Sequence, residues 1–212
     1  MKRTLYLKIL LGYLIFGVLG FITVSTFTSR ISMDYIQENE ADALYREANL
    51  IASTYATNYY NSAVTLEDLQ RQLKTLDTYL AAQIWIVDTQ GKLLVNSREP
   101  VDMDNQTIIH NFNITDFGSR YYQTGNFYGM LAQKNLSVFS QFTINYKVQG
   151  YVFIHKPLSD ISSYHNGLLN QSYLTLLILF ACAFVLLIFI TFTIYLPIRK
   201  IILGADAYAN GD

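Results

Sequence analysis

Two long runs of uncharged, mostly apolar residues lie near the ends of the chain. The first covers residues 9–29, and the second covers residues 173–196. A helix rises about 1.5 Å per residue, so each run is long enough to cross the hydrocarbon core of a bilayer, which is about 30 Å thick. The pattern therefore predicts two transmembrane helices, one near each end.

Basic residues flank both runs on their outer sides. Lys2 and Arg3 precede the first run, whereas Arg199 and Lys200 follow the second. Because Lys and Arg accumulate on the cytoplasmic side of membrane helices, both termini are expected in the cytoplasm. Residues 30–172 are then expected outside the cell membrane.

The basic tail of residues 1–8, followed by an apolar run, is also the arrangement of a secretory signal peptide. Here the apolar run is longer than that of a usual signal peptide, and no clear small-residue cleavage site follows it. We therefore expect an uncleaved membrane anchor behind a short cytoplasmic tail.

After the first run, apolar residues recur three or four positions apart, which is the spacing of one helical face. The pattern predicts a long helix that continues out of the membrane through residues 31–60. Its apolar face could pack on a sheet of the same chain or on the same helix of a second subunit, and the sequence leaves both open. The residues of this face are Leu44, Ala48, Ile51, Tyr55 and Tyr59.

A second amphipathic helix is predicted after Thr65, whose hydroxyl suits an N-cap position. Glu67 and Asp68 follow, and their charges suit the positive N-terminal end of a helix. An apolar seam with alternating spacings of three and four runs through Leu66, Leu69, Leu73, Leu76 and Leu80.

From Gln83 the pattern changes to that of extended chain. Residues 83–87 are rich in β-branched and aromatic side chains, residues 88–91 have Asp first and Gly fourth as in a type I turn, and residues 93–95 are again apolar. This order predicts a β-hairpin.

Three further strands are predicted at residues 126–131, 136–146 and 150–155, the last two joined by a turn at residues 147–150. Five strands in antiparallel neighbours, preceded by two helices, make an α+β fold.

Composition adds three constraints. Hydrophobic residues make up 51% of the chain and charged residues 15%, against about a quarter charged in typical soluble domains. The segment between the two runs has more acidic than basic residues, which argues against nucleic acid as a partner. The only cysteine, Cys182, lies inside the second run, so the outer domain is held by its core without a disulfide.

The second run leads into residues 197–212, which begin with Pro197 and then repeat small or apolar residues at spacings of four, three and four. Such spacing is the start of a coiled-coil seam. This junction resembles the beginning of a HAMP signalling module. An ordinary juxtamembrane helix is the alternative. The residues expected to transmit a signal are Pro157, Pro197, Ile198, Ile202, Ala205 and Ala209.

The order of elements resembles the N-terminal half of bacterial transmembrane sensor histidine kinases. Residues 85–94 and 150–161 carry the sharpest local similarity. The resemblance implies that residues 30–172 form an extracytoplasmic PAS-like domain of the Cache group, and that the chain acts as a homodimer. It also implies that the stimulus is an extracellular ligand or protein.

The resemblance further implies that the kinase domain, with its ATP and Mg, would follow Asp212 and pass the signal to a cytoplasmic response regulator. The 212 residues themselves contain no Gly-rich phosphate loop, and all three histidines fall on the outer side. We expect no catalysis and no cofactor in this part. The front end of a chemoreceptor or cyclase receptor, and a non-signalling envelope protein, are the alternatives.

A ligand site is expected between Arg98 and Tyr128, because this stretch lacks clear periodicity and the equivalent segment of PAS-like folds forms a lid over the sheet. Its candidate ligand-binding residues are Arg98, Arg120, Tyr121, Tyr122 and Tyr128. Arg120 beside Tyr121 and Tyr122 suits a carboxylate or a small zwitterion. A solvated arginine and core aromatic residues are the alternative interpretation.

His110, Asp102 and Asp104 are residues of types that bind metal ions, and together they are a candidate metal site. A solvated acidic loop accounts for these residues better, so no metal is predicted.

Small residues occur in both runs, at Gly17 and Gly20 in the first and at Ala181 and Ala183 in the second. Small faces allow membrane helices to approach closely. They are candidates for the packing of four spanning helices in a parallel homodimer.

Overall fold

The computed structural model describes residues 3–100, 107–118 and 120–209. The chain divides into two compact units. One unit is Ser32–His165, which holds the sheet, and the other consists of the helical segments Met1–Ile31 and Asn166–Asp212.

The sheet has five antiparallel strands in the order β2-β1-β5-β4-β3, so the predicted α+β class and strand number are confirmed. Strand β5 lies in the middle, between β1 and β4, and β2 and β3 are the edges. The strands are β1 (Gln83–Asp88), β2 (Leu93–Asn96), β3 (Tyr122–Gly125), β4 (Asn135–Ile144) and β5 (Lys147–Pro157).

The predicted hairpin of β1 and β2 is confirmed. The Asp88 carboxylate accepts hydrogen bonds from the backbone N–H groups of Gln90 and Lys92, at 2.8 and 2.9 Å. Gly91 has a φ of +85°, a conformation that glycine adopts without steric cost. The aspartate and the glycine therefore fix the turn as the sequence indicates.

The turn between β4 and β5 was predicted at residues 147–150, and this was wrong. It lies at Asn145 and Tyr146, both of which have positive φ, of 50° and 63°, as a two-residue hairpin turn requires. Gly150 lies within β5, where a Cβ atom would come 2.4 Å from the backbone oxygen of Val87. The glycine serves close strand contact and not the turn.

The third strand was predicted at residues 126–131, and this was also wrong. Strand β3 comes earlier, and the chain then turns through Phe127, Tyr128 and Gly129, all with positive φ. Phe127 is buried, so its apolar side chain packs into the core from a turn. Apolar character alone did not distinguish these two arrangements.

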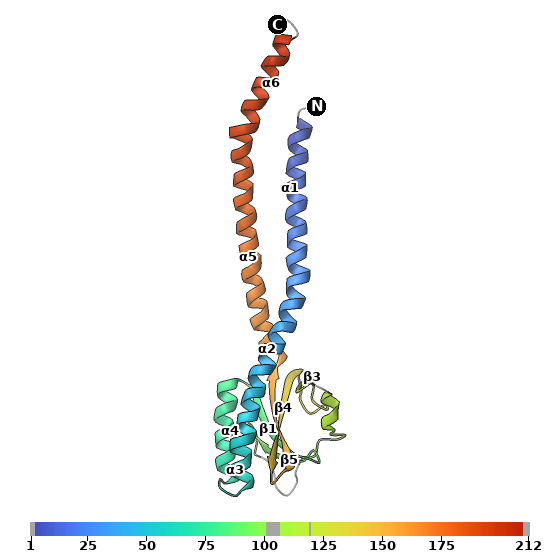
Figure 1. The fold of residues 1–212 in the computed structure, drawn as a ribbon, viewed down its shortest axis with the longest axis vertical. Helices are drawn as coiled ribbons and strands as arrows, with labels where there is room; N and C mark the ends of the chain where they lie inside the picture. The colour runs from blue at the N-terminus through green and yellow to red at the C-terminus, as the bar shows by residue number, and fades with distance from the viewer. Residues whose placement is uncertain (1–2, 101–106, 119, 210–212) are drawn as a thin grey trace. The chain divides into compact units, whose positions relative to one another are not determined.

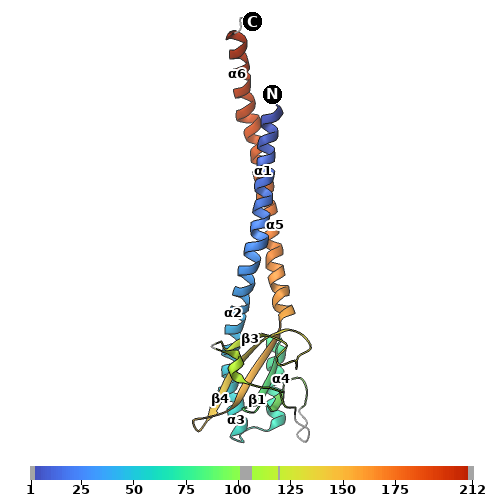
Figure 2. The ribbon, with the colours of Figure 1, turned by 90° about the vertical axis from the view of Figure 1, so that its right-hand side faces the viewer.

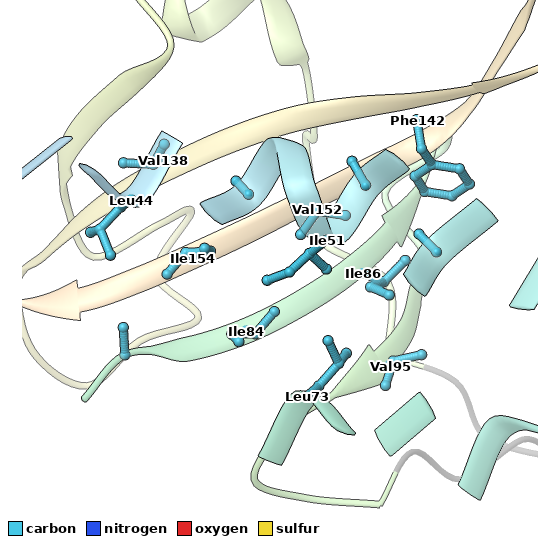
Figure 3. Packing of buried hydrophobic residues seen from close by; sticks show 14 of the residues in the cluster. Leu44, Ile51, Leu73, Ile84, Ile86, Val95, Val138, Phe142, Val152 and Ile154 are labelled. Carbon is cyan, nitrogen blue, oxygen red and sulfur yellow. The ribbon is translucent and has the colours of Figure 1, made fainter. Parts of the chain in front are cut away.

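Helices cover one face of the sheet (Figure 1). The long N-terminal helix runs as α2 (Ser29–Leu50), a π-helical turn η2 (Ile51–Ala56) and α3 (Thr57–Tyr60). Leu44, Ala48 and Ile51 are buried against residues of β1, β4 and β5. The apolar face therefore packs on the sheet of its own chain (Figure 3).

Helix α4 (Leu66–Leu80) begins as predicted, because the Thr65 hydroxyl accepts a hydrogen bond from the N–H of Asp68 at 3.2 Å. Leu69 and Leu73 are fully buried in the same core as the long helix. Asp77 also lies on the buried face.

The other face of the sheet is covered by residues 107–118, which contain the short 3-10 helix η3 (Ile114–Phe117), and by residues 126–131, which follow β3 (Figures 1 and 2). An aromatic core lies beneath them. The two cores give the sheet unit two apolar layers, one on each side of β1, β4 and β5.

The helical unit contains α1 (Arg3–Thr23), the π-helical turn η1 (Val24–Thr28), the later part of α5 (Leu158–Ile190), the π-helical turn η4 (Thr191–Tyr195) and α6 (Leu196–Ala209). In the described chain, one helix is long and apolar enough to cross a membrane, Leu158–Ile202, and Leu10–Thr26 is a shorter apolar helix.

Helices α1 and α5 pack against each other in this unit. The ring of Tyr13 stacks on that of Phe180 with centroids 4.3 Å apart. A Cβ atom on Gly17 would come 2.1 Å from the Phe180 ring. Gly17 therefore allows a contact within the chain, while its expected role in a dimer stays a prediction.

Candidate functional site

Aromatic side chains fill the space between the sheet and the two covering segments, residues 107–118 and 126–131. Phe127 lies at the centre, with its ring centroid 5.7 Å from Trp85, 4.8 Å from Phe153 and 4.5 Å from His155. Phe117 packs on Phe153 from the 3-10 helix. These rings occupy the face where the sequence predicts a ligand pocket.

A polar group is buried among these rings. His155, on the central strand β5, is 1% exposed, and its Nδ1 lies 2.8 Å from the hydroxyl oxygen of Ser137 on β4. Neither His155 Nε2 nor Trp85 Nε1 has a hydrogen-bond partner among the described residues. A buried polar atom without a partner is costly, so this pair is a candidate point of contact for a small polar molecule.

Burial lowers the pKa of His155 from 6.5 to about 3, and the positive charge of Arg98 acts in the same direction. The imidazole is therefore neutral near pH 7. One ring nitrogen faces Ser137, and the other is left for an additional partner.

Arg98 is held by Asp77 at the end of α4. The guanidinium donates to the carboxylate at 2.9 and 3.1 Å, and the Ser97 hydroxyl donates to the same carboxylate at 2.6 Å. Ser97 also accepts from the backbone N–H of Ile84 at 3.0 Å. This network joins α4, β1 and the end of β2, so Arg98 has a structural role here.

Tyr128 lies in the turn after β3, where its hydroxyl donates to the carbonyl oxygen of Asn113 at 2.8 Å and lies 3.0 Å from a carboxylate oxygen of Asp116. Burial raises the pKa of Tyr128 above its usual value, and the Asp116 carboxylate adds to this effect. These contacts join the turn after β3 to the residues around the 3-10 helix η3.

Arg120, Tyr121 and Tyr122 line a different cavity, of about 450 Å³, together with residues of α2. The Arg120 guanidinium carbon lies 5.9 Å from the centroid of the Tyr122 ring. The Tyr121 hydroxyl donates to Asp42 on α2, and its ring packs on that of Tyr45. The candidate ligand residues thus fall into three places, and Arg120, Tyr121 and Tyr122 line one cavity together.

The residues expected to transmit a signal lie at two element junctions. Pro157 is the buried last residue of β5. Pro197 lies in the first turn of α6, directly after η4, and Ile198 and Ile202 are half exposed on α6. The side chains of Ala205 and Ala209 lie outside the described residues. The seam itself stays a prediction.

The metal hypothesis involved Asp102 and Asp104, which also lie outside the described residues. His110 is exposed. Within residues 3–100, 107–118 and 120–209, no group of three or more His, Cys, Asp or Glu residues is placed to hold a metal ion.

Sequence analysis missed three functional candidates. In the sequence, His155 is one residue of a predicted strand and nothing near it marks it as functional. Its distinguishing feature is the buried contact with Ser137, 18 residues away along the chain. Asp34 and Glu38 join the Arg120 cavity from α2, more than 80 residues away along the chain. Their spacing of four along a helix was the available clue, because it places both on one face.

No protein-family model and no curated protein matches the chain. Among solved structures, one similar chain is a domain of a sensory box/GGDEF family protein from Vibrio parahaemolyticus. It has 16% sequence identity and a TM-score of 0.49, and the match covers 66% of this chain and 61% of that one.

Another similar structure is the sensor domain of the V. cholerae histidine kinase DctB, with 15% identity, a TM-score of 0.46 and coverage of 72% and 60%. A third is the sensory domain of the Campylobacter jejuni chemoreceptor Tlp3 with isoleucine bound, with 14% identity, a TM-score of 0.38 and coverage of 68% and 65%.

The chain is similar to sensor domains of histidine kinases and chemoreceptors. The matches span less than two thirds of those chains, and at these identities no residue role is transferred from them.

Proposed function

We propose that this chain is the transmembrane input module of a sensor histidine kinase. Its outer domain detects an extracellular stimulus and passes it through the second apolar helix to a HAMP-like cytoplasmic helix. The kinase, its ATP and Mg, and the response regulator that it phosphorylates belong to a part of the protein beyond Asp212.

The observation that carries the proposal is the junction between β5 and α5. Strand β5 is the central strand, it ends at Pro157, and α5 begins at the next residue, Leu158. The Leu158 N–H donates to the Lys134 carbonyl at 3.0 Å, and Lys156 pairs with Glu40 on α2 at 2.5 Å. No linker separates the sheet from the apolar helix, so a shift of the strand is transmitted directly.

The proposed topology has two spans. Leu158–Ile202 contains one helix of sufficient length, and the shorter apolar helix Leu10–Thr26 supports the other. Basic residues outside both runs support cytoplasmic termini and an extracytoplasmic domain between them. The long, exposed apolar surfaces of these helices suit a lipid bilayer.

The module acts as a homodimer in this proposal, in which the membrane helices of two copies have two alternative packings. Two packings that differ by a few kcal/mol suffice, since a ligand shifts such an equilibrium by its differential affinity for the two states. Ile198 and Ile202, half exposed on α6, support a dimer seam in the cytoplasm.

The proposal is tested with a chimera in which residues 1–212 precede the output domains of a known histidine kinase. One to four alanines are inserted between Ser172 and Tyr173, within α5. Each added alanine rotates the helix that follows it by about 100°. We expect autophosphorylation to rise and fall with insertion length, because the register of α6 sets the output.

The matched control inserts the same alanines after Gly91, in the turn between β1 and β2. These insertions leave the register of α5 unchanged and should not produce the periodic effect. Equal kinase activity for every α5 insertion, indistinguishable from that of the output domains alone, would reject the proposed coupling. The same chimera with a cyclase output or a chemoreceptor output separates the alternatives.

A further inference from the structure

We propose that the cavity between α2 and β3 is a binding site for a small zwitterion, a molecule that carries an ammonium group and an anionic group a few bonds apart. This inference deepens the proposed function and rests on it, since it assigns a ligand class and a site to the sensor. The site lies at the β3 edge of the sheet, and its residues are separate from the aromatic core beneath residues 107–118 and 126–131.

The cavity has opposite charges on its two sides. Asp34, Gln37 and Glu38 of α2 form one wall, and Arg120 and Tyr122 at β3 form the other. Its volume of about 450 Å³ is within the range of small-molecule sites. An amino acid, a betaine or a phosphoethanolamine group is of the size and polarity that such a cavity accepts.

Among the described residues, the charged side chains that line the cavity form no ion pairs. The ion pairs formed by the described residues are Arg71–Asp68, Arg98–Asp77 and Lys156–Glu40. Arg120, Asp34 and Glu38 take part in none of them, although they line the same cavity. A guanidinium and two carboxylates are therefore free to bind a ligand.

Asp34 and Glu38 are four residues apart on one helix, so their like charges face the same way and repel each other. An ammonium group between them removes this repulsion. The guanidinium of Arg120 can donate two parallel hydrogen bonds to a carboxylate or a phosphate. Only a ligand with both charges can bind the carboxylates of α2 and the Arg120 guanidinium at the same time.

Tyr122 contributes a third element of recognition. Its ring lies near the Arg120 guanidinium, with 5.9 Å between the guanidinium carbon and the ring centroid, and the Tyr121 ring meets it edge to face at 5.6 Å. Aromatic faces attract cations. The Tyr122 ring therefore helps to hold the Arg120 guanidinium at the wall that binds the anionic group of the ligand.

Ligand binding here would strengthen the contact between α2 and the sheet. One turn further along α2, Asp42 accepts from the Tyr121 hydroxyl and Tyr45 packs on the Tyr121 ring. A zwitterion that bridges Glu38 and Arg120 extends this contact by one turn toward the N-terminal end of α2. The stimulus would thereby change the position of the helix that follows the first apolar run.

The test measures binding to the full 212-residue chain in a non-ionic maltoside detergent, by isothermal titration calorimetry. The probes are the twenty protein amino acids, glycine betaine and O-phosphoethanolamine, each up to about 10 mM, well above a Kd of about 1 mM. Acetate and methylamine, which carry one charge each, are the ligand controls. We expect at least one zwitterion to bind and neither control to bind.

Two variants place the binding in this cavity. Arg120→Ala and Glu38→Gln should each weaken the binding by about tenfold or more, because each removes a charge-assisted hydrogen bond. The matched controls are Arg46→Ala and Glu47→Gln, on α2 but outside the cavity, and Glu47 lies on the opposite face of the helix from Glu38. These should bind as the unmodified chain does.

The outcomes separate the possible sources of the ligand. Binding of an amino acid or betaine indicates a free metabolite, and binding of O-phosphoethanolamine alone indicates a lipid headgroup. Absence of binding by every zwitterion, or binding unchanged in both cavity variants, overturns the site. The alanine-insertion experiment needs no ligand, so its result judges the signalling function separately. Tight binding that leaves the output of the chimera unchanged would contradict the function and leave the site standing.

Discussion

The Nδ1 atom of His155 lies 2.8 Å from the hydroxyl oxygen of Ser137 on the neighbouring strand, inside an aromatic core. The other ring nitrogen has no partner among the described residues. The central strand of the sheet thus carries a neutral imidazole in an apolar layer. Because burial disfavours protonation of this imidazole in the folded chain, the folding stability depends on pH.

Folding stability should fall as the pH decreases from 6.5 toward about 3. In this window the unfolded chain binds a proton at His155, whereas the folded chain, whose pKa is lowered to about 3, does not. The contribution is about 1.4 kcal/mol per pH unit. Above pH 6.5 both states are neutral there, and the contribution vanishes.

Urea unfolding in detergent, followed by the fluorescence of Trp85, the single tryptophan, measures this dependence. The slope that belongs to His155 is the difference between the unmodified chain and His155→Gln. His110→Gln, at an exposed histidine, is the matched control. Identical pH profiles for the unmodified chain and His155→Gln would contradict the prediction.

Asp77→Ala should destabilise the sheet unit by about 1–3 kcal/mol, because Ser97 and Arg98 lose their shared acceptor. Arg98→Ala should cost less, since the Arg98 side chain is 48% exposed and that of Asp77 is 11% exposed. A double-mutant cycle by urea unfolding should give a coupling of about 1 kcal/mol. Additive effects of the two substitutions would show that the pair contributes nothing.

Gly150→Ala should destabilise the chain by about 1–3 kcal/mol, because the added methyl group would clash with the backbone oxygen of Val87. A change of side-chain rotamer cannot relieve a clash with a backbone atom. Gly167→Ala is the matched control, since this helical glycine has open space around it. It should be neutral or slightly stabilising. Equal thermal midpoints for the two variants would show that the strands separate without cost.

A cysteine at Thr89, in the exposed turn between β1 and β2, should react with a membrane-impermeant maleimide on intact cells. The natural Cys182 is first replaced by alanine. A cysteine at Lys200 should react only after lysis, because α6 is proposed to lie in the cytoplasm. The reverse pattern of labelling would invert the proposed topology.

The sequence by itself determined the elements that depend on local pattern. The seam of α4 and its Thr65 cap, the Asp88 turn and the apolar face of the long helix are encoded by residues within one or two turns of each other. Hydrophobic spacing reports which face is buried, so the class of fold and the number of strands followed from it.

Only the tertiary structure decided the role of residues whose local sequence fits more than one structure. Gly150 suggests a turn in the sequence, yet it permits β5 to approach β1, and Phe127 lies in a turn although its apolar neighbours suggest a strand. Arg98 and Arg120 both lie in the stretch where the sequence predicts a ligand site, but Arg98 is bound by Asp77, whereas Arg120 lines a cavity with residues of α2. Such pairings join residues far apart in the chain, and local periodicity carries no information about them.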